Sequence, residues 1–211
     1  MVGRITLLGT GTCQLLPNRM ASSVLVQLEG IQVVYDFGRG VAHQLARLGL
    51  GSNDLQHIII SHFHPDHSSD LLPYLHAACY SRVDPRSKVL HIYGPPGWRR
   101  VLESMLSLYG PDALYKPDRF SMEIHEVPSA TLEIEGWIFE FVSLPHRNNH
   151  GLAFTFQGQR YAFTGDCHYH DQEVAFILGA ELAVIDAGHH TPDEIIELAA
   201  RAQPRCLVLS H

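Results

Sequence analysis

Residues 55–67 read LQHIIISHFHPDH, and this stretch decides the fold. It begins with a short, nearly continuous apolar run, which is typical of a buried strand. Alternate residues of an extended segment point to the same side, so His62 and His64 can face one point. Asp66 and His67 follow at the turn into the next predicted helix and can face a second point nearby. Three imidazoles and one carboxylate in six residues form a mixed nitrogen and oxygen set that suits zinc or a similar divalent ion.

Histidine or aspartate also closes three later strands that the sequence predicts. The segments are Leu144-Pro145-His146, Thr164-Gly165-Asp166 and Leu209-Ser210-His211. Each residue taken alone is better explained as structural. Strand ends of an α/β protein meet at one edge of a sheet, where such proteins usually place their sites. Together the three residues therefore complete two metal sites.

Length and composition favour a single domain, residues 1–211. With 45 % hydrophobic and 18 % charged residues, the chain has enough apolar side chains for a core, which argues against disorder and fibrous repeats. No apolar run approaches the roughly 18–20 residues that cross a bilayer, and the N-terminus has no signal-peptide pattern. Neither a membrane partner nor a secreted form is expected.

Charge and cysteine usage bear on partners and compartment. The 22 acidic and 15 basic residues give a formal net charge of −7, which disfavours an overall electrostatic grip on nucleic acid but leaves room for a local patch. Four scattered cysteines without a CxxC pair are typical of reduced thiols in a cytoplasmic protein.

The order of predicted elements indicates an α/β protein with two sheets inside helices. Helical spacing marks residues 41–48, 71–80 and 98–109, and a capping-box pattern at Thr191 starts a helix over 192–202. The predicted strands are residues 4–8, 23–28, 32–35, 55–61, 89–93, 121–127, 131–134, 137–144, 151–157, 160–163, 182–186 and 206–210.

These motifs together resemble the metallo-β-lactamase-fold hydrolases, and within them the ribonuclease Z-like phosphodiesterase branch. The resemblance covers nearly the whole chain. It rests on ITLLGTGT in the first strand and turn, the strand-ending DFG, HxHxDH, IYGPPG at 92–97, LPH, TGD and the final LVLSH. It implies a four-layer αββα sandwich and a metal-dependent hydrolase.

The resemblance also implies the ligands of two divalent ions. One ion is expected on His62, His64 and His146, and the other on Asp66, His67 and His211, with Asp166 bridging both. The histidine-rich set favours zinc, while manganese or iron fits similar ligands. A hydroxide that bridges the two ions would attack the phosphodiester, because binding to metal lowers the pKa of water from 15.7 to about 7.

Phosphodiester cleavage calls for two further roles. Asp66 can orient the attacking hydroxide while it acts as a ligand, and the leaving alkoxide needs a proton from a histidine outside the metal shell. Relatives of the branch carry a catalytic histidine at a similar strand end, which selects His189 here, with its neighbour His190 as the competing donor and an exposed loop pair as the alternative. Asp36 is interpreted either as a carboxylate that orients a metal-bound imidazole or as a turn-former.

The connection between His146 and Asp166 bears on the substrate. In the tRNA-processing members of the branch a long flexible arm lies there, whereas residues 147–165 of this chain read as a hairpin. The expected substrate is therefore a small phosphodiester, such as a cyclic one, ahead of a tRNA precursor. The alternatives are a tRNA 3′-processing endonuclease, a lactone or thioester hydrolase, and a non-catalytic metal-bearing accessory protein. Nucleic acid is a disfavoured partner, and a homodimer is left open.

Some residues have no clear role in this scheme. Asp70 stands where many relatives have glycine, which changes the helix entry or places a charge behind the site. Relatives continue past His211, so the sequence leaves open whether more chain follows. The remaining histidines interpreted as structural or solvated are His43, His57, His76, His91 and His125.

Overall fold

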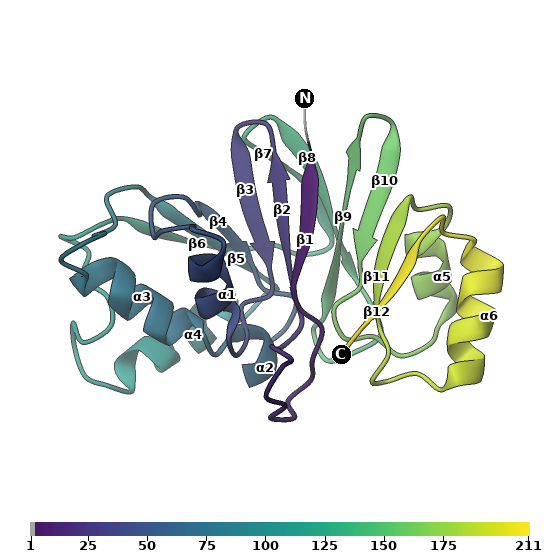
Figure 1. Ribbon diagram of the computed structural model, residues 1–211, viewed down its shortest axis with the longest axis horizontal. Coiled ribbons are helices and arrows are strands. Elements are labelled where there is room, and N and C mark those ends of the chain that lie inside the picture. The colour runs from purple at the N-terminus through teal and green to yellow at the C-terminus, as the bar shows by residue number, and fades with distance from the viewer. Residues whose placement is uncertain (1–2) are drawn as a thin grey trace. The chain divides into compact units, whose positions relative to one another are not determined.

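The computed structural model describes residues 3–211, which form two compact units, one up to Glu126 and the other Val127–His211 (Figure 1). The predicted domain begins at Met1, and the N-terminus is predicted to have no signal peptide. Met1 and Val2 lie outside the described residues. Each unit contains one six-stranded sheet with helices against one face, which is the α/β class that the sequence predicts. The single domain 1–211 stays a prediction.

The sheet of the first unit has the strand order β1-β2-β3-β4-β5-β6. Strands β1 to β3 pair antiparallel and β3 to β6 pair parallel. Since parallel strands end at the same edge, the segments that follow β3 and β4 leave the sheet side by side. The strands are β1 (Arg4–Gly9), β2 (Ser23–Leu28), β3 (Ile31–Tyr35), β4 (His57–Ile59), β5 (Leu90–Gly94) and β6 (Met122–Glu126).

Three helices, α1 (Val41–Arg47), α3 (Leu71–Tyr80) and α4 (Trp98–Ser107), cover one face of this sheet (Figure 1). A fourth, α2 (Pro65–Ser68), is a single short turn. The core between sheet and helices is fully buried and includes Ile58, Ile92, Leu75 and Trp98.

Asp70 supports the start of α1. Its Oδ2 accepts a hydrogen bond from the Ala42 amide at 3.1 Å, which satisfies one of the free N–H groups at that helix end. Asp70 is also the N-cap residue of α3, the helix whose entry it was expected to change, but its side chain makes no capping hydrogen bond there.

The sheet of the second unit has the order β12-β11-β10-β9-β8-β7. Strands β7 to β10 pair antiparallel, and β10 to β12 pair parallel. Strands β8 and β10 both oppose β9, so β8, β10, β11 and β12 all end at one edge. The strands are β7 (Ala130–Ile134), β8 (Trp137–Ser143), β9 (His150–Phe156), β10 (Gln159–Phe163), β11 (Leu182–Asp186) and β12 (Leu207–Ser210).

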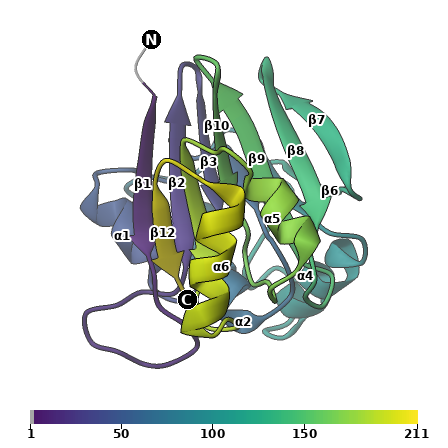
Figure 2. The same ribbon diagram turned by 90° about the vertical axis from the view of Figure 1, so that its right-hand side faces the viewer.

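Helices α5 (Asp171–Ile177) and α6 (Pro192–Ala202) lie next to each other along this sheet (Figure 2). Their buried side chains, among them Ile177 and Leu198, pack with small strand residues such as Ala183. Helix α6 begins with the predicted capping box, because Thr191 accepts from the Glu194 amide and the Glu194 carboxylate accepts from the Thr191 amide.

The predicted strands and long helices are confirmed to within about two residues at each end. Helices α2 and α5 were not predicted, since each spans two turns or fewer and shows no sustained 3.6-residue pattern. Strand β4 is shorter than the predicted 55–61, because the Ser61 amide leaves the ladder and donates to the Asp36 carboxylate. Among residues 3–211, no helix combines the length and the apolarity that crossing a bilayer requires.

Candidate metal centre

The four predicted ligands of the first unit lie together in the loop and short helix after β4. Nε2 of His62 and Nδ1 of His64 are 2.8 Å apart, and the His62 and His67 rings have centroids 4.3 Å apart. Asp66 Oδ2 lies 4.0 Å from Nε2 of His67. His62 and His64 thus lie close together as expected, although the segment that carries them is bent and not the extended one that the prediction assumed, and α2 brings the other two residues to the same place.

Asp36, the residue directly after β3, has a buried carboxylate that orients these imidazoles. Asp36 is 1 % exposed, and its Oδ2 lies 2.7 Å from Nδ1 of His67. The same oxygen accepts from the Ser61 hydroxyl at 2.9 Å, and that hydroxyl lies 3.0 Å from Nδ1 of His62. Since Nδ1 of both rings is engaged in this way, their Nε2 atoms are the ones directed at a ligand. Asp36 also has a φ of 64°, so the structure supports both interpretations, a turn residue and a carboxylate that orients an imidazole.

The DFG segment, Asp36-Phe37-Gly38, determines how closely the loop after β3 approaches the segment after β4. The Phe37 amide donates to the His67 carbonyl at 2.7 Å, and the Asp70 amide donates to the Phe37 carbonyl at 3.0 Å. A Cβ at Gly38 would collide with the Asp66 carbonyl oxygen. Glycine at position 38 is therefore required for the loop that carries Asp66 and His67 to lie against the end of β3.

In the second unit, three imidazoles surround one carboxylate oxygen. Oδ2 of Asp166 lies 3.9 Å from Nε2 of His146, 3.9 Å from Nδ1 of His189 and 3.7 Å from Nε2 of His211. These distances are too long for hydrogen bonds. The distances from Nε2 of His146 and of His211 are somewhat longer than the roughly 3.3 Å that separates two ligand atoms of a tetrahedral zinc ion with bonds of about 2.0–2.1 Å, whereas Nδ1 of His189 is engaged by Asp186.

Asp186, the last residue of β11, supports two of these rings, and sequence reasoning missed it. Its carboxylate lies 2.6 Å from Nδ1 of His189 and 3.2 Å from Nδ1 of His211, and it also accepts from the Cys167 amide at 2.9 Å. Burial alone would raise the pKa of Asp186, but these hydrogen bonds, with the nearby His189, hold that pKa below its usual value. The signal that could have found it is the one shared with Asp36, an aspartate at the end of an apolar strand.

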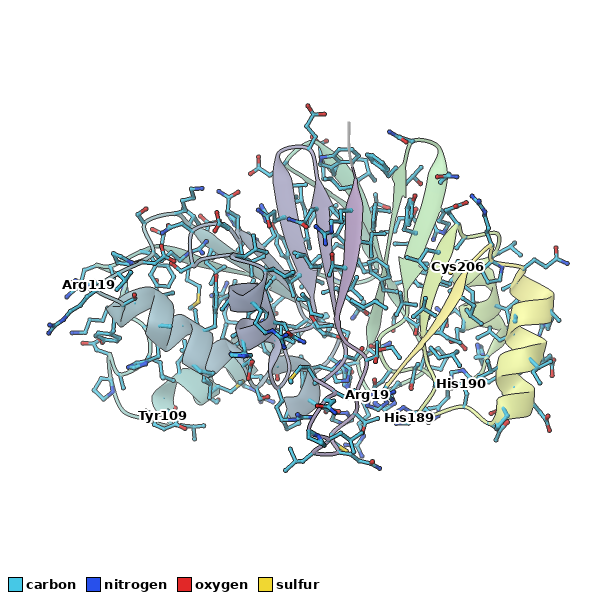
Figure 3. The ribbon with its side chains drawn as sticks, viewed as in Figure 1. Arg19, Tyr109, Arg119, His189, His190 and Cys206 are labelled. Atoms are coloured by element: carbon cyan, nitrogen blue, oxygen red, sulfur yellow. The ribbon has the colours of Figure 1, made fainter. Side chains whose placement is uncertain are left out.

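The two neighbouring histidines after β11, labelled in Figure 3, differ in burial and in their partners. The His189 side chain is 28 % exposed, whereas His190 and its partner Glu173 are both 0 % exposed, with Nε2 of His190 2.9 Å from Oε2 of Glu173. Burial by itself lowers the pKa of His190, but the hydrogen bond and charge of Glu173 raise it overall. No sequence signal pointed to Glu173, which lies in the short helix α5.

The donor chemistry of each unit suits a divalent metal ion. The first unit offers three imidazoles and a carboxylate, and in the second Asp166, Asp186, His189 and His211 offer ligand atoms that all lie within 4.8 Å of one another. Burial raises the pKa of the Cys167 thiol well above its usual value, which favours the protonated thiol in this neighbouring side chain. The nitrogen and oxygen set fits zinc, manganese or iron better than a soft ion.

Residues 32–211 match the family model of the beta-lactamase superfamily domain. The chain belongs to the beta-lactamase superfamily. Similar curated proteins of known name include the ribonuclease Z of Mycobacterium marinum, which is 29 % identical over 173 residues, 77 % of this chain and 62 % of that protein. The ribonuclease Z of Mycolicibacterium gilvum is 37 % identical over 112 residues, 53 % of this chain and 39 % of that protein. The chain thus spans less than two thirds of the length of these relatives.

Solved structures of the superfamily agree with this assignment. The short form of human tRNase Z is 26 % identical with a TM-score of 0.78, and the match covers 100 % of this chain and 92 % of that one. The metallo-β-lactamase fold protein YhfI of Bacillus subtilis has a TM-score of 0.82 at 22 % identity, covering 99 % of this chain and 85 % of that one, and shows the fold alone.

These matches confirm the resemblance that the motifs indicated. The superfamily, its α/β sandwich fold and the likeness to ribonuclease Z-type metal-dependent hydrolases are as expected. The histidine and aspartate clusters agree with binding of divalent metal.

Proposed function

We propose that this superfamily member is a dinuclear metal-dependent phosphodiesterase. The observation that carries the proposal is a feature common to both units, a buried aspartate at a strand end that engages Nδ1 of predicted ligand histidines. Asp36 does so for His67, and Asp186 does so for His211. Ligand imidazoles in metal sites almost always donate their other ring N–H to a carboxylate, a carbonyl or water, so this arrangement supports the ligand assignment.

The proposed ligands are those that the family resemblance implies. One ion is assigned to His62, His64 and His146, and the second to Asp66, His67 and His211, with Asp166 shared. The donor geometry inside each unit supports the assignment, as does the nitrogen-rich set, which favours zinc for both ions. We also place the protein in the cytoplasm, on the strength of its four cysteines without disulfides.

Two divalent ions would activate water at neutral pH and offset the negative charge of a phosphodiester. The chain's own residues would handle the protons. Asp66 would accept a hydrogen bond from the attacking water and so orient it. His189 would donate a proton to the leaving oxygen from Nε2, while Asp186 holds Nδ1 at 2.6 Å and thereby fixes the direction of the ring. The burial of His190 against Glu173 supports His189 as the donor.

The proposed substrate is a small phosphodiester. The part of the chain between His146 and Asp166 is filled by the hairpin of β9 and β10, in which Phe156 pairs with Gln159 across a two-residue turn. A long arm that could grip tRNA is therefore missing at this point of the described chain. tRNA 3′-end processing is the second candidate, because the similar curated proteins are ribonucleases Z.

Comparative hydrolysis assays test the proposal. Metal-loaded protein is incubated with bis(p-nitrophenyl) phosphate, cyclic nucleotides, a tRNA precursor, a lactone and a thioester, with a His64→Ala variant as the control for contaminating enzymes. We expect turnover of the small phosphodiesters that the variant lacks. Cleavage of the tRNA precursor alone would favour the second candidate, and activity on only the lactone or thioester would refute phosphodiester hydrolysis. No turnover of any substrate by metal-loaded protein would indicate a non-catalytic role.

A further inference from the structure

A second cluster of metal-ligating side chains lies on strands β5 and β6 of the first unit. His91 is on β5, and Glu123 and His125 are on β6, the last strand of the sheet. His91 is directly opposite Glu123 in the parallel pairing, and His125 is two residues further along β6. Residues two apart in a strand point to the same face, so all three side chains lie on one side of the sheet.

This side of the sheet is opposite the helices. The residues between the three, Ile92 on β5 and Ile124 on β6, point the other way and belong to the core that packs on the helices of this unit. The cluster therefore lies on the strands themselves, away from the loop after β4 that carries the HxHxDH ligands. It includes none of the residues assigned to the proposed dinuclear centre.

The three ligand atoms are spaced like the corners of a zinc tetrahedron. Nδ1 of His91 lies 3.2 Å from Nε2 of His125 and 3.4 Å from Oε2 of Glu123, and those last two atoms are 3.7 Å apart. A tetrahedral zinc ion with bonds of about 2.0–2.1 Å has ligand atoms about 3.3 Å apart. Each residue contributes a single atom to these distances: Nδ1 of His91, Oε2 of Glu123 and Nε2 of His125. One ion can therefore contact all three residues.

We propose that His91, Glu123 and His125 form a third metal site that binds zinc or a similar divalent ion and joins the edge strand β6 to β5. Two imidazoles and one carboxylate are three of the four ligands that zinc requires, and water can supply the fourth. Their side chains are 25 %, 54 % and 35 % exposed, so an ion can reach them from solvent.

Charges of both signs lie around the cluster. Glu123 supplies the negative charge that a cation needs. Arg99 supplies a positive charge nearby, and its guanidinium is engaged by the Ile124 carbonyl, to which it donates.

Aromatic side chains hold the ligand rings in place from the same face. Tyr93, the β5 residue that pairs with His125, stacks on it with centroids 4.6 Å apart. The Tyr93 hydroxyl lies 3.3 Å from Nδ1 of His57, which in turn stacks on His91. The ligand rings are therefore confined by neighbours on β4 and β5, as in a site formed before the ion arrives.

Zinc stoichiometry tests the site. The full chain is dialysed against micromolar zinc and its bound metal is counted, for wild type, Glu123→Gln, the double variant His91→Ala/His125→Ala, and His43→Ala as an exposed-histidine control. We expect the first two variants to bind one zinc fewer than wild type and the control to bind as many as wild type. Equal stoichiometry in wild type and the Glu123→Gln variant would mean that the cluster is only a hydrogen-bonded pair of imidazoles with an ion pair.

A second background separates this site from the proposed dinuclear centre. In His62→Ala/His67→Ala/Asp166→Ala protein, which leaves each ion of that centre only two of its assigned ligands, one zinc should remain, and adding Glu123→Gln should remove it. Zinc should also raise the melting temperature of this background protein, because binding to the folded state stabilises it, and Glu123→Gln should abolish the rise. Absence of any bound zinc in this folded background would overturn the proposal. The outcome does not depend on whether the protein hydrolyses phosphodiesters.

Discussion

Nδ1 of His67 lies 2.7 Å from Oδ2 of Asp36, and both side chains are only 1 % exposed. The two residues follow different strands, β3 and β4, and meet because these strands pair in parallel and end at the same edge. A carboxylate in this position fixes the ring and raises its basicity as a ligand. The pairing of β3 with β4 therefore affects the metal affinity of the proposed centre, because it brings Asp36 to His67.

Asp36→Asn should weaken metal binding without removing a ligand. We expect a 10–100-fold loss of affinity, which is typical when a partner of a ligand histidine is changed. The measurement is competition with a chelator at fixed pH. Asp70→Asn is the matched control, since Asp70 also accepts a backbone hydrogen bond near this loop but contacts none of the imidazoles through an observed bond. Equal affinities for Asp36→Asn and wild type would show that Asp36 only shapes the turn.

His64→Ala should abolish hydrolysis together with loss of metal. The alanine removes one of three proposed ligands of the first ion, and Nε2 of His62 loses the neighbouring nitrogen at 2.8 Å. Bound metal and turnover are measured on the same sample. His43→Ala removes an exposed histidine of α1 and should change neither quantity. Full activity in the His64 variant would contradict the proposed centre.

His189→Ala should keep the metal and slow turnover by roughly 10²–10⁴, the usual range for general acid–base catalysis. The ring is partly exposed and held at Nδ1 by Asp186, so its removal leaves the proposed ligands in place. The metal content of the variant distinguishes a proton donor from a metal ligand, which is the other role that the geometry allows for His189. If the variant loses one ion, His189 is a ligand together with Asp166 and His211, with which it can share a metal.

Tyr74→Phe should change how stability depends on pH above neutrality. Burial raises the pKa of Tyr74 to about 12, and its hydroxyl donates to the Ser52 carbonyl and accepts from Arg86. Between about pH 10 and 12 the unfolded chain releases this proton and the folded one keeps it, so the folded state binds more protons and stability falls as pH rises. The contribution that wild type loses over this range is about 2–3 kcal/mol.

Denaturant unfolding of both proteins at several pH values isolates this effect. At pH 7 the variant should be less stable by about 1 kcal/mol, because it lacks the hydroxyl's hydrogen bonds. The difference should shrink and then reverse toward pH 12, since the variant has no proton to lose at this position. Parallel curves for the two proteins would show that the pKa of Tyr74 is unshifted.

The sequence predicted those features of the site that depend on local geometry. The closeness of His62 and His64 follows from their two-residue spacing, and the start of α6 follows from the three-residue spacing of Thr191 and Glu194. In both cases the residues that interact are neighbours in the chain, so the pattern alone carries the information. The ends of the strands before His146 and Asp166 could be predicted because apolar runs stop there.

Other parts of the site could not be predicted in this way. Glu173 lies in a segment with an ordinary pattern and acquires a role only through His190, which folding brings near. Asp186 ends an apolar strand, but its contact with His211 depends on the pairing of β11 with β12. His91 and His125, interpreted from the sequence as structural or solvated, are 34 positions apart. Only the register of β5 against β6 brings their nitrogens within 3.2 Å.

By itself the sequence determined the family and the α/β class and predicted the metal ligands, because short motifs and the period of apolar residues carry this information. The tertiary structure decided which carboxylates stand behind the imidazoles, which of two adjacent histidines is buried and which distant histidines come together. Those contacts depend on strand pairing and helix packing, whose register no local pattern specifies.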